Sequence, residues 1–557
     1  MDTVEASAVG VGQAPVTTVP VTERPATADA LIDLPADPET PWVAPTWFTR
    51  LFLVGAVVAV AIGIVLRFWT TTDMWLDEAL TFNIARLPLS QLPGALKRDG
   101  APPLYYAMLH FWIEAFGPSD LAVRALSGLL SCATLPFVWL AGKRLGGRTV
   151  AAGAVLLLAS SPFAVRYATE NRMYALVAFL TAAGLVALQR TLERPAVGNL
   201  VGVALATSAL LYSQYWSLYL LGVMALWLAF QAWRGPVSRR RGAKAALVAS
   251  VVGWITFVPW VPIFLYQSRH TGTPWAVPAD FAALVNAVSS FAGGATNQGR
   301  ALALLYFALA GLGLFGVAGG LRHIVLDVRT RPTGRGLAVV TVATLFVAVI
   351  CGYISRSAFQ ARYASVIFVS LSLLVAMGFA TFSDQRIRVG VMTATVVFGI
   401  AGSVPNIWTS RTQAGQVSTS LAKLGKKGDI VAYCPDQLGP SVSRLLPGDR
   451  YRQITFPRDT GPQFVNWVDY AQATAAGNPA RFAAKVESLA GSTHTIWLVW
   501  ASGYETYHTK CEQIVNDLLG DHGYTTRTVF QATQLLNSSV VYEHMGLVQL
   551  TPVAAGG

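Results

Sequence analysis

The sequence has few charged residues. Only 13% of its 557 residues are Asp, Glu, Lys or Arg, and 53% are hydrophobic, whereas a soluble protein carries about a quarter charged residues. Repeated apolar runs of about 20 residues suit the thickness of a bilayer's hydrocarbon core. The composition therefore excludes an ordinary soluble enzyme and predicts a polytopic membrane protein.

Several sequence motifs are also missing. The chain has no dinucleotide-binding fingerprint, P-loop, zinc-ligand spacing or serine-nucleophile elbow. The glycine pairs at 146–147, 293–294 and 319–320 are too sparse to cradle phosphates and indicate turns. These absences disfavour ATP as the energy source and a nucleotide sugar as a donor.

The first 45 residues lack the charged start and early apolar run of a cleaved signal peptide. They are rich in Pro, Thr and Ala and have no hydrophobic periodicity. We predict that residues 1–45 form a disordered cytoplasmic tail.

The net charge of +12 does not come from one basic patch. Basic residues gather in short clusters between apolar runs, at 143–148, 190–194, 239–244, 322–335 and 386–388. Such clusters are typical of cytoplasmic loops. Without a basic and aromatic groove pattern, nucleic-acid binding is not indicated.

These loops predict a topology of eleven spans in the plasma membrane. The candidate spans are 51–69, 121–142, 149–165, 172–190, 197–212, 216–233, 245–266, 302–321, 336–354, 361–382 and 388–407. A further apolar stretch, 102–117, is short and carries His110 and Glu114, and its crossing would move every later basic loop outside. We therefore predict a juxtamembrane or re-entrant helix there, on the outer face. The N-terminus is then cytoplasmic and the C-terminus outside, with a transmembrane domain at 46–408 and outer loops at 70–120 and 267–301.

The sequence changes character from Thr409 onward. Strands are predicted at 429–434, 494–501, 525–532 and 538–550, and helices at 478–490 and 509–520. Residues 409–557 are therefore predicted to form a small extracytoplasmic α/β domain. The fold class is a mainly α-helical polytopic membrane protein with this α/β domain attached.

The chain has four cysteines, two of them in the outer domain. Cys434 and Cys511 lie on the oxidising side of the membrane, so we predict a disulfide between them. The alternative is two buried thiols. Cys132 and Cys351 lie within predicted spans.

Two neighbouring acids, Asp77 and Glu78, follow the first span in "MWLDEALTF". A loop acid beside a helix N-terminal cap is the simplest explanation. Apolar surroundings at the bilayer surface would instead make either carboxylate a better general base than in water. The pair could also bind a hard divalent cation. Because no third ligand is evident, the sequence leaves the cofactor and metal dependence unknown.

Arginines occupy two predicted outer turns, against the usual charge bias. One turn carries Arg166, Glu170 and Arg172, and the other carries Arg356 and Arg362. Such side chains often only snorkel to the interface. Bidentate binding of a phosphate is the alternative function. Arg269 and His270 are weaker candidates of the same kind.

Aromatic residues gather on the same predicted face. The set is Tyr105, Tyr106, Trp112, Tyr167, Tyr174, Tyr212, Tyr215, Trp216 and Tyr363. An interfacial aromatic belt accounts for such a set in any membrane protein. Sugar stacking or hydroxyl hydrogen bonding in a cleft is the functional alternative.

An ordered series of segments over residues 51–382 resembles one family. The segments are "WLDEA" (75–79), "DGAPPLYYAMLHFWIEAFG" (99–117), "RALSGLLSCATLPFVWLAGKRLGGR" (124–148), "LLLASSPFAVRYATENRMYAL" (156–176), "LLYSQYWSLYLL" (210–221) and "FQARYASV" (359–366). Together they resemble the polytopic C-type (GT-C) glycosyltransferases of the protein-mannosyltransferase and aminoarabinose-transferase type, that is, glycosyltransferase family 39-like enzymes.

The resemblance implies inverting sugar transfer from a polyprenyl-phosphate donor to a hydroxyl of a glycan, lipid or protein acceptor, on the extracytoplasmic face. Asp77 matches the family's catalytic carboxylate, with Glu78 beside it. Arg172 and Arg362 match basic positions that would hold the lipid phosphate. We expect further contributions to the donor site from Arg166, Glu170, Arg356, Tyr363, Tyr105 and Tyr215.

The chain departs from the family at two places. Ala101 precedes the Pro-Pro pair where members commonly have a histidine, and Gln214–Tyr215 replaces a frequent His-Tyr pair. Any role of those histidines in holding a metal or substrate is therefore in doubt for this chain.

Two other function classes fit the composition. A transporter of an envelope lipid or glycan precursor would place polar groups near the bilayer midplane, often with internal repeats, and neither feature is evident. An inactive scaffold whose outer domain recruits partners would not need the intact "WLDEA" segment.

Overall fold

The computed structural model describes residues 44–272, 280–318, 323–327, 329, 332–355, 359–520, 523–532 and 543–553. By its internal contacts the chain divides into Met1–Pro41 and a second compact unit, Trp42–Gly557. Except for residues 44 and 45, the tail predicted at 1–45 lies outside the described residues.

The second unit is mostly helical, as its composition predicts. Among the described residues, eight helical stretches are long and apolar enough to cross a membrane. They are α1 (Thr46–Leu66), α5 (Asp120–Ser160), α7 (Tyr174–Glu193), α10 (Val237–Ile255) continued by η2 (Val258–Trp260) and α11 (Val261–His270), α13 (Asn297–Phe315), α14 (Pro332–Ser355), η3 (Ala361–Ala364) with α15 (Ser365–Phe379), and α16 (Gln385–Ser403) with η4 (Val404–Ile407).

The long helix α5 contains two of the predicted spans. Its backbone leaves the helical conformation at Gly146 and at Gly147, where φ is +74°. Glycine adopts a positive φ without the steric cost of a side chain. A Cβ at Gly142 would lie 2.9 Å from the Cα of Ala151, so the two halves fold back against each other. The predicted spans at 121–142 and 149–165 are thus separate helices, and the second ends at Ser160, where a short helix follows.

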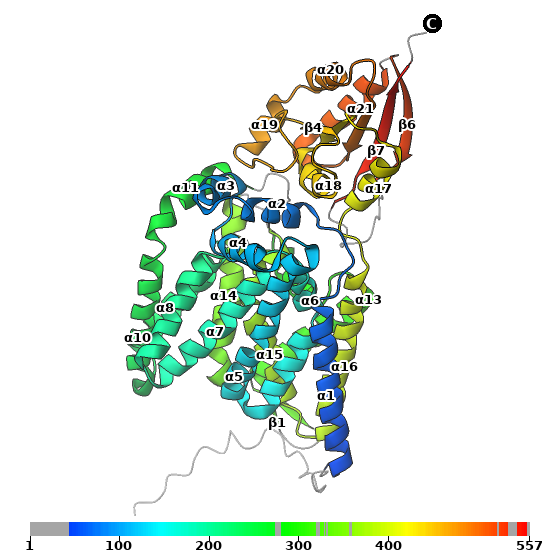
Figure 1. Ribbon diagram of the computed structural model, residues 1–557. Helices are drawn as coiled ribbons and strands as arrows, with labels where there is room; N and C mark the ends of the chain where they lie inside the picture. Colours follow the sequence, from blue (N-terminus) through cyan, green and yellow to red (C-terminus); the bar gives the residue numbers. More distant parts are fainter. Residues whose placement is uncertain are drawn as a thin grey trace, which may run out of the picture. The chain divides into compact units, whose positions relative to one another are not determined.

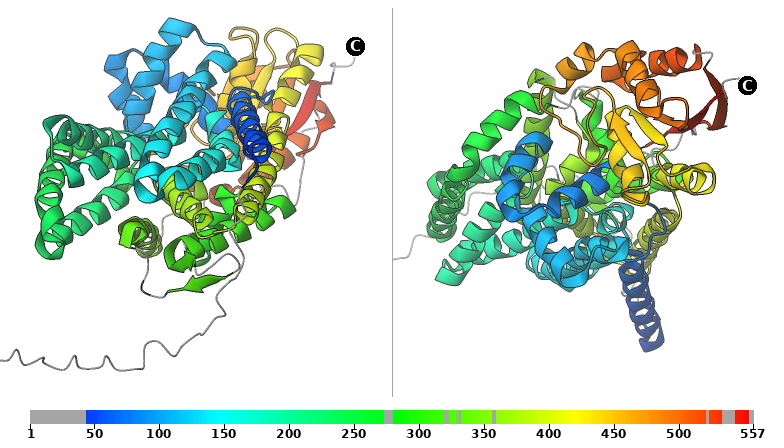
Figure 2. Two further views of the ribbon diagram at one scale, coloured as in Figure 1. Left: turned by 90° about the horizontal axis from the view of Figure 1, so that it is seen from below. Right: turned by 45° about the horizontal axis from the view of Figure 1, so that its top comes forward.

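Two further apolar helices complete the bundle. The shorter α8 (Val197–Leu211) packs against α7 and α10, and α9 (Ser217–Arg234) packs against α10 and α14. Viewed from below, α8 to α10 lie at one side of the bundle, and α1 lies beside α16 at another (Figure 2). Within the described residues, each of the eleven predicted spans overlaps a helix, and the number of eleven membrane crossings stays a prediction.

Short helices gather at one end of this bundle (Figure 1). They are α2 (Leu76–Ala85), η1 (Leu89–Gln91), α3 (Leu92–Asp99), α4 (Leu104–Phe116), α6 (Pro162–Ala168) and α12 (Ala282–Phe291). The predicted helix at 102–117 is confirmed as α4, which packs against α2 and α5. The long loop predicted at 267–301 is corrected, because its described part contains α12, the end of α11 and the start of α13. A small hairpin, β1 (Gly316–Ala318) with β2 (Ile324–Leu326), lies between α13 and α14.

The C-terminal part contains a five-stranded sheet in the order β4-β3-β5-β7-β6. The strands are β3 (Ile430–Cys434), β4 (Arg452–Thr455), β5 (Ile496–Trp500), β6 (Tyr524–Phe530) and β7 (Gly546–Pro552). β3 runs parallel to β4 and β5, and β7 is antiparallel to β5 and β6. The predicted α/β character is therefore confirmed. β4 is not predicted from the sequence, and residues 533–542, within and before the predicted strand at 538–550, lie outside the described residues.

Helices cover both faces of this sheet. α17 (Ala414–Leu424) and α18 (Gly439–Leu445) pack on the face that carries Val431 and Trp497. The predicted helices α20 (Pro479–Ala490) and α21 (Lys510–Gly520) pack on the other face, and α19 (Tyr470–Ala476) precedes them. All five residues of β3 are buried, as expected for a central parallel strand covered on both sides.

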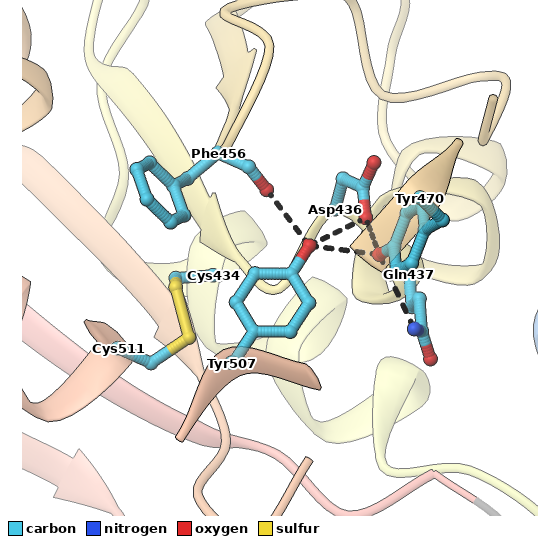
Figure 3. Close-up of a disulfide and its surroundings, with 7 residues drawn as sticks. All are labelled: Cys434, Asp436, Gln437, Phe456, Tyr470, Tyr507 and Cys511. Carbon is cyan, nitrogen blue, oxygen red and sulfur yellow. Dashed lines mark hydrogen bonds between the residues drawn. A yellow bond between two sulfur atoms is a disulfide. The ribbon is translucent and has the colours of Figure 1, made fainter. Parts of the chain in front are cut away.

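The structure joins Cys434, at the end of β3, to Cys511 in α21 by a disulfide (Figure 3). This is the pairing expected from the sequence. Beside it, the hydroxyls of Tyr470 and Tyr507 both donate hydrogen bonds to the carboxylate of Asp436 (Figure 3). Burial raises the pKa of Asp436 to about 6.

Candidate active site

The two predicted acids occupy the first turn of α2, which begins directly after Trp75. Neighbouring helix residues are rotated by about 100° around the axis, so the two side chains face different surroundings. The side chain of Asp77 is 17% exposed, whereas that of Glu78 is fully buried.

Asp77 lies between two arginines. Its Oδ2 atom is 3.5 Å from Nη2 of Arg362, in η3, and 3.9 Å from Nη2 of Arg172, in the turn between α6 and α7. These distances exceed those of a charge-assisted hydrogen bond. The chain thus brings together the three residues that the family resemblance singles out, with loose contacts between them.

Arg172 is positioned by neighbouring hydroxyls. Its Nη1 donates to Thr81 Oγ1 at 2.8 Å and to the hydroxyl of Tyr106 at 3.3 Å. Tyr106 in turn donates to the carboxylate of Asp99 at 2.7 Å. Burial raises the pKa of Asp99 and that of Tyr106. Both residues lie in the segment 99–117 that carries the family resemblance, and Tyr106 belongs to the aromatic set, but the sequence analysis assigns no role to Asp99.

Three buried polar atoms in this region have no hydrogen-bond partner among the described residues. They are Nε of Arg172, Nε of Arg362 and the hydroxyl of Tyr174. The Arg362 guanidinium also lies 5.2 Å from the centre of the Trp75 ring, close enough for a cation–π contact. Buried donors without partners are costly, so the cluster is suited to an anionic ligand that accepts hydrogen bonds.

Glu78 is held in a closed set of hydrogen bonds. Arg124 donates to both of its oxygens, at 2.7 and 2.8 Å, and Arg411 donates to Oε2 at 3.2 Å. The backbone N–H of Asn171 donates to Oε1 at 3.1 Å. Burial raises the pKa of Glu78, but the two guanidiniums and the hydrogen bonds outweigh it and bring the pKa to about 2. Glu78 thus has the position of a buried structural anion.

Arg411 reaches Glu78 from the segment that leads into the C-terminal part of the chain. It is fully buried and also donates to the carbonyl and hydroxyl of Thr169, at 2.9 and 2.7 Å, and to Asn406 at 3.2 Å. Burial lowers its pKa to about 9. Sequence reasoning misses both Arg124 and Arg411, because each meets Glu78 only through the tertiary fold.

The remaining predicted site residues lie around this core. Arg166 and Glu170 form an ion pair at 3.4 Å. Tyr105 is buried, with its hydroxyl bonded to Ser127 and Asn171, so it packs inside the protein and does not line a cleft. Arg356 lies outside the described residues.

The aromatic residues Tyr215 and Tyr363 make contacts with neighbouring segments of the chain. Tyr215 donates to Gln267 and accepts from Trp260 at 2.9 Å. Tyr363 stacks loosely against Trp216, and its carbonyl accepts from Gln214 at 3.4 Å. The positions where relatives have histidines thus make protein contacts here: Gln214 also accepts from Ser365, and the Ala101 carbonyl accepts from Gln267.

His270 contacts the C-terminal part of the chain. Its Nδ1 lies 3.0 Å from Asp469, and its ring stacks on Tyr266. Within the described ranges, no group of three or more His, Cys, Asp or Glu side chains is arranged to hold a metal ion. Asp77 and Glu78 face different partners, so they do not form a paired ligand set.

Comparison with known proteins finds a family match over part of the chain, which includes Arg172 but not Asp77 or Arg362. Residues 100–263 match the family model described as dolichyl-phosphate-mannose-protein mannosyltransferase. No curated protein matches the chain.

Solved structures extend the likeness to most of the chain. The crystal structure of ArnT from Cupriavidus metallidurans bound to undecaprenyl phosphate is 14% identical, with a TM-score of 0.52, over 92% of this chain and 99% of that chain. The apo structure of the same protein is 12% identical, with a TM-score of 0.55, over 90% of this chain and 98% of that one.

The resemblance inferred from the sequence is therefore confirmed. The chain has the GT-C fold, and its matched segment is that of a glycosyltransferase family. The family match over residues 100–263 agrees with the predicted enzyme class, a glycosyltransferase, and the eight long apolar helices of the described residues agree with a multi-pass membrane protein.

Proposed function

We propose that the protein transfers a sugar from a polyprenyl-phosphate donor to a hydroxyl acceptor, with Asp77 as the general base. The observation that supports this proposal is the position of Asp77 between two arginines from different elements. Its Oδ2 atom lies 3.5 Å from Nη2 of Arg362 and 3.9 Å from Nη2 of Arg172. A base and a phosphate-binding pair thus occupy the same site.

The arginine pair supports a phosphate-linked donor. Nε of Arg172 and Nε of Arg362 are buried donors that a phosphate's oxygens could accept from. ArnT, which has a similar fold, was crystallised bound to undecaprenyl phosphate, a polyprenyl phosphate. As the phosphate binds, the arginines would turn from Asp77 to the ligand, and the carboxylate would be released to act as a base.

The reaction is a single displacement with inversion at the anomeric carbon. The acceptor oxygen attacks that carbon and gives its proton to Asp77, while the bond from the carbon to the phosphate oxygen breaks. The polyprenyl phosphate leaves with the bonding electrons. Arg172 and Arg362 stabilise the negative charge that gathers on it in the transition state.

Glu78 supports this chemistry without taking part in it. Its two oxygens are taken up by Arg124, Arg411 and the Asn171 backbone. We assign it the role of fixing α2, so that Asp77 alone is the reacting carboxylate.

The proposed location of the site is the extracytoplasmic face. The stretch Val237–His270 has its His270 end at the C-terminal part, near Asp469, and its basic residues 239–241 at the other end. Basic residues favour the cytoplasmic side. The end that carries α2 and Asp77 is then outside, where a lipid-linked sugar is delivered from the membrane.

Replacement of Asp77 by Asn tests this proposal. The purified full-length protein is assayed with a panel of undecaprenyl-phosphate sugars and a cell-envelope extract as acceptor. We expect transfer to fall about 10²–10⁴-fold, the usual contribution of a general base, while undecaprenyl phosphate still binds. Glu114→Gln, at an exposed acid on α4, is the matched control and should transfer normally. Normal turnover by Asp77→Asn would refute the role of Asp77.

A further inference from the structure

The catalytic helix α2 does not cap its own N-terminus. The residue before its first turn is Trp75, whose side chain makes no capping hydrogen bond. The first backbone N–H groups of a helix have no partner within the helix. In α2 the N–H of Leu76 is instead taken by Oε1 of Glu543, at 3.0 Å, from 467 positions further along the chain.

Glu543 is itself firmly placed. It lies just before β7, is 1% exposed, and its Oε1 also accepts from Ser441 of α18 at 3.2 Å. Its backbone pairs with Arg411 and Gln413 on both sides of an isolated β-bridge at Thr412. α18 packs directly against α2, so the C-terminal part of the chain contacts the helix that carries Asp77 (Figure 1).

The second carboxyl oxygen of Glu543, Oε2, is buried without a hydrogen-bond partner among the described residues. The titratable groups that face it are Asp77, from α2, and Tyr504, from the loop after β5. Burial raises the pKa of Glu543 to about 8, and the nearby negative charge of Asp77 acts in the same direction. At neutral pH the side chain is therefore mostly protonated, and Oε1 remains free to accept from Leu76.

We propose that Glu543 is a positioning residue for the transfer reaction: it caps α2 from the C-terminal domain and thereby fixes the direction of Asp77, the next residue after Leu76. This inference rests on the proposed function for its effect on catalysis. A carboxyl oxygen at a helix N-terminus stabilises the first turn, and small displacements of a reacting group reduce the rate. Glu543 touches neither the donor nor the acceptor in this scheme.

Two variants of Glu543 distinguish the effect of its capping hydrogen bond from the effect of its charge. Glu543→Ala removes the acceptor, and we expect kcat to fall roughly five- to thirtyfold with an unchanged KM for the donor, the range expected from loss of a cap. Glu543→Gln keeps an acceptor oxygen and should retain wild-type kcat at pH 7. Asp517→Ala, at an exposed acid on α21, is the control and should leave kcat unchanged.

Hydrogen exchange of the α2 amides gives a readout that does not depend on activity. In full-length protein, exchange in peptides covering 76–82 should be faster in Glu543→Ala than in wild type or Glu543→Gln. A raised pKa means that the docked carboxyl is favoured at low pH and that this advantage is lost as pH rises through about 8. Exchange of wild type relative to Glu543→Gln should therefore increase from about pH 5 to about pH 8 and level off above it, a comparison that does not need Glu543→Ala to fold.

The outcomes distinguish this inference from the proposed function. Wild-type kcat and wild-type exchange in Glu543→Ala would overturn the inference, and so would a constant ratio of exchange between wild type and Glu543→Gln across this pH range. If exchange responds as expected but wild type transfers none of the sugars, the proposed function fails while the capping of α2 by Glu543 stands.

Discussion

Asp77 and Glu78 are neighbours in sequence with the same functional group, yet their surroundings are opposite. Around Asp77, the guanidiniums of Arg362 and Arg172 lie at 3.5 and 3.9 Å. The Nε atom of each is a buried donor that has no hydrogen-bond partner among the described residues. Around Glu78, two guanidiniums and a backbone N–H complete a network with bonds as short as 2.7 Å. The first arrangement leaves donors of both arginines for a ligand, whereas in the second both carboxylate oxygens of Glu78 are already bonded.

The difference shows that partners, and not burial alone, decide what a carboxylate can do. Glu78 is fully buried but has a pKa of about 2, because Arg124 and Arg411 outweigh the cost of burial. Glu543 is equally buried without an arginine bonded to it, and burial raises its pKa to about 8. A buried ion pair is costly to form, and removing one partner is costlier still.

The largest expected difference between Asp77 and Glu78 is in their contribution to the free energy of unfolding. Glu78→Gln leaves Arg124 and Arg411 buried beside a neutral side chain, and we expect it to lower the free energy of unfolding by about 3–5 kcal/mol. Asp77→Asn should change stability by well under 1 kcal/mol, since its ion pairs are long and partly exposed. Thermal unfolding of the detergent-solubilised proteins measures both.

If Glu78→Gln and Asp77→Asn lowered the free energy of unfolding equally, the distinction between a structural Glu78 and a reacting Asp77 would be lost. Loss of activity in a stable, folded Glu78→Gln protein would also count against it, because Glu78 would then act directly in the reaction.

A smaller effect is expected on ligand binding at Arg362. Arg362→Ala should weaken binding of undecaprenyl phosphate about 10- to 100-fold, the range for hydrogen bonds to a charged group. Arg362→Lys should recover part of the loss, because lysine keeps the charge but not the planar fork of donors. Titration of each purified protein with the lipid phosphate gives the affinities, and Arg481→Ala, at an exposed arginine on α20, is the control. Equal affinity in wild type and Arg362→Ala would place the phosphate elsewhere.

The last prediction has no effect on the reaction rate. It concerns the side of the membrane on which the end that carries α2 lies. In protein with Cys132 and Cys351 replaced by Ser, a cysteine at the exposed Ser90, beside α3, should react with an impermeant thiol reagent added to intact cells. A cysteine at the exposed Lys244 should react only after the membrane is opened. The reverse pattern would put Asp77 in the cytosol and end the proposal of an outer active site.

The helices and strands followed from local patterns in the sequence. Apolar runs of the right length predicted the spans, and Gly146–Gly147 marked the turn inside α5. Alternating and β-branched residues predicted β3, β5 and β6. β4 was missed, because its four residues include Arg452 and Gln453, which lack the strand pattern.

The family motifs predict that Asp77, Arg172 and Arg362 belong to one site, and in the structure Asp77 lies within 4 Å of both arginines. Arg124, Arg411 and Glu543 could not be found in this way. Each of the three contacts α2 from a position at least 46 residues away in the sequence. The sequence around each one resembles that around an ordinary surface arginine or glutamate.

The bond between Arg411 and Glu78 joins residues separated by 333 positions, and it limits how the two parts of the molecule can evolve. A chimera that exchanged the C-terminal α/β part for that of a distant homologue would lose one positive charge beside Glu78 unless the new part supplied an equivalent arginine. The helical bundle and the C-terminal α/β part are therefore expected to be inherited together rather than exchanged as independent modules.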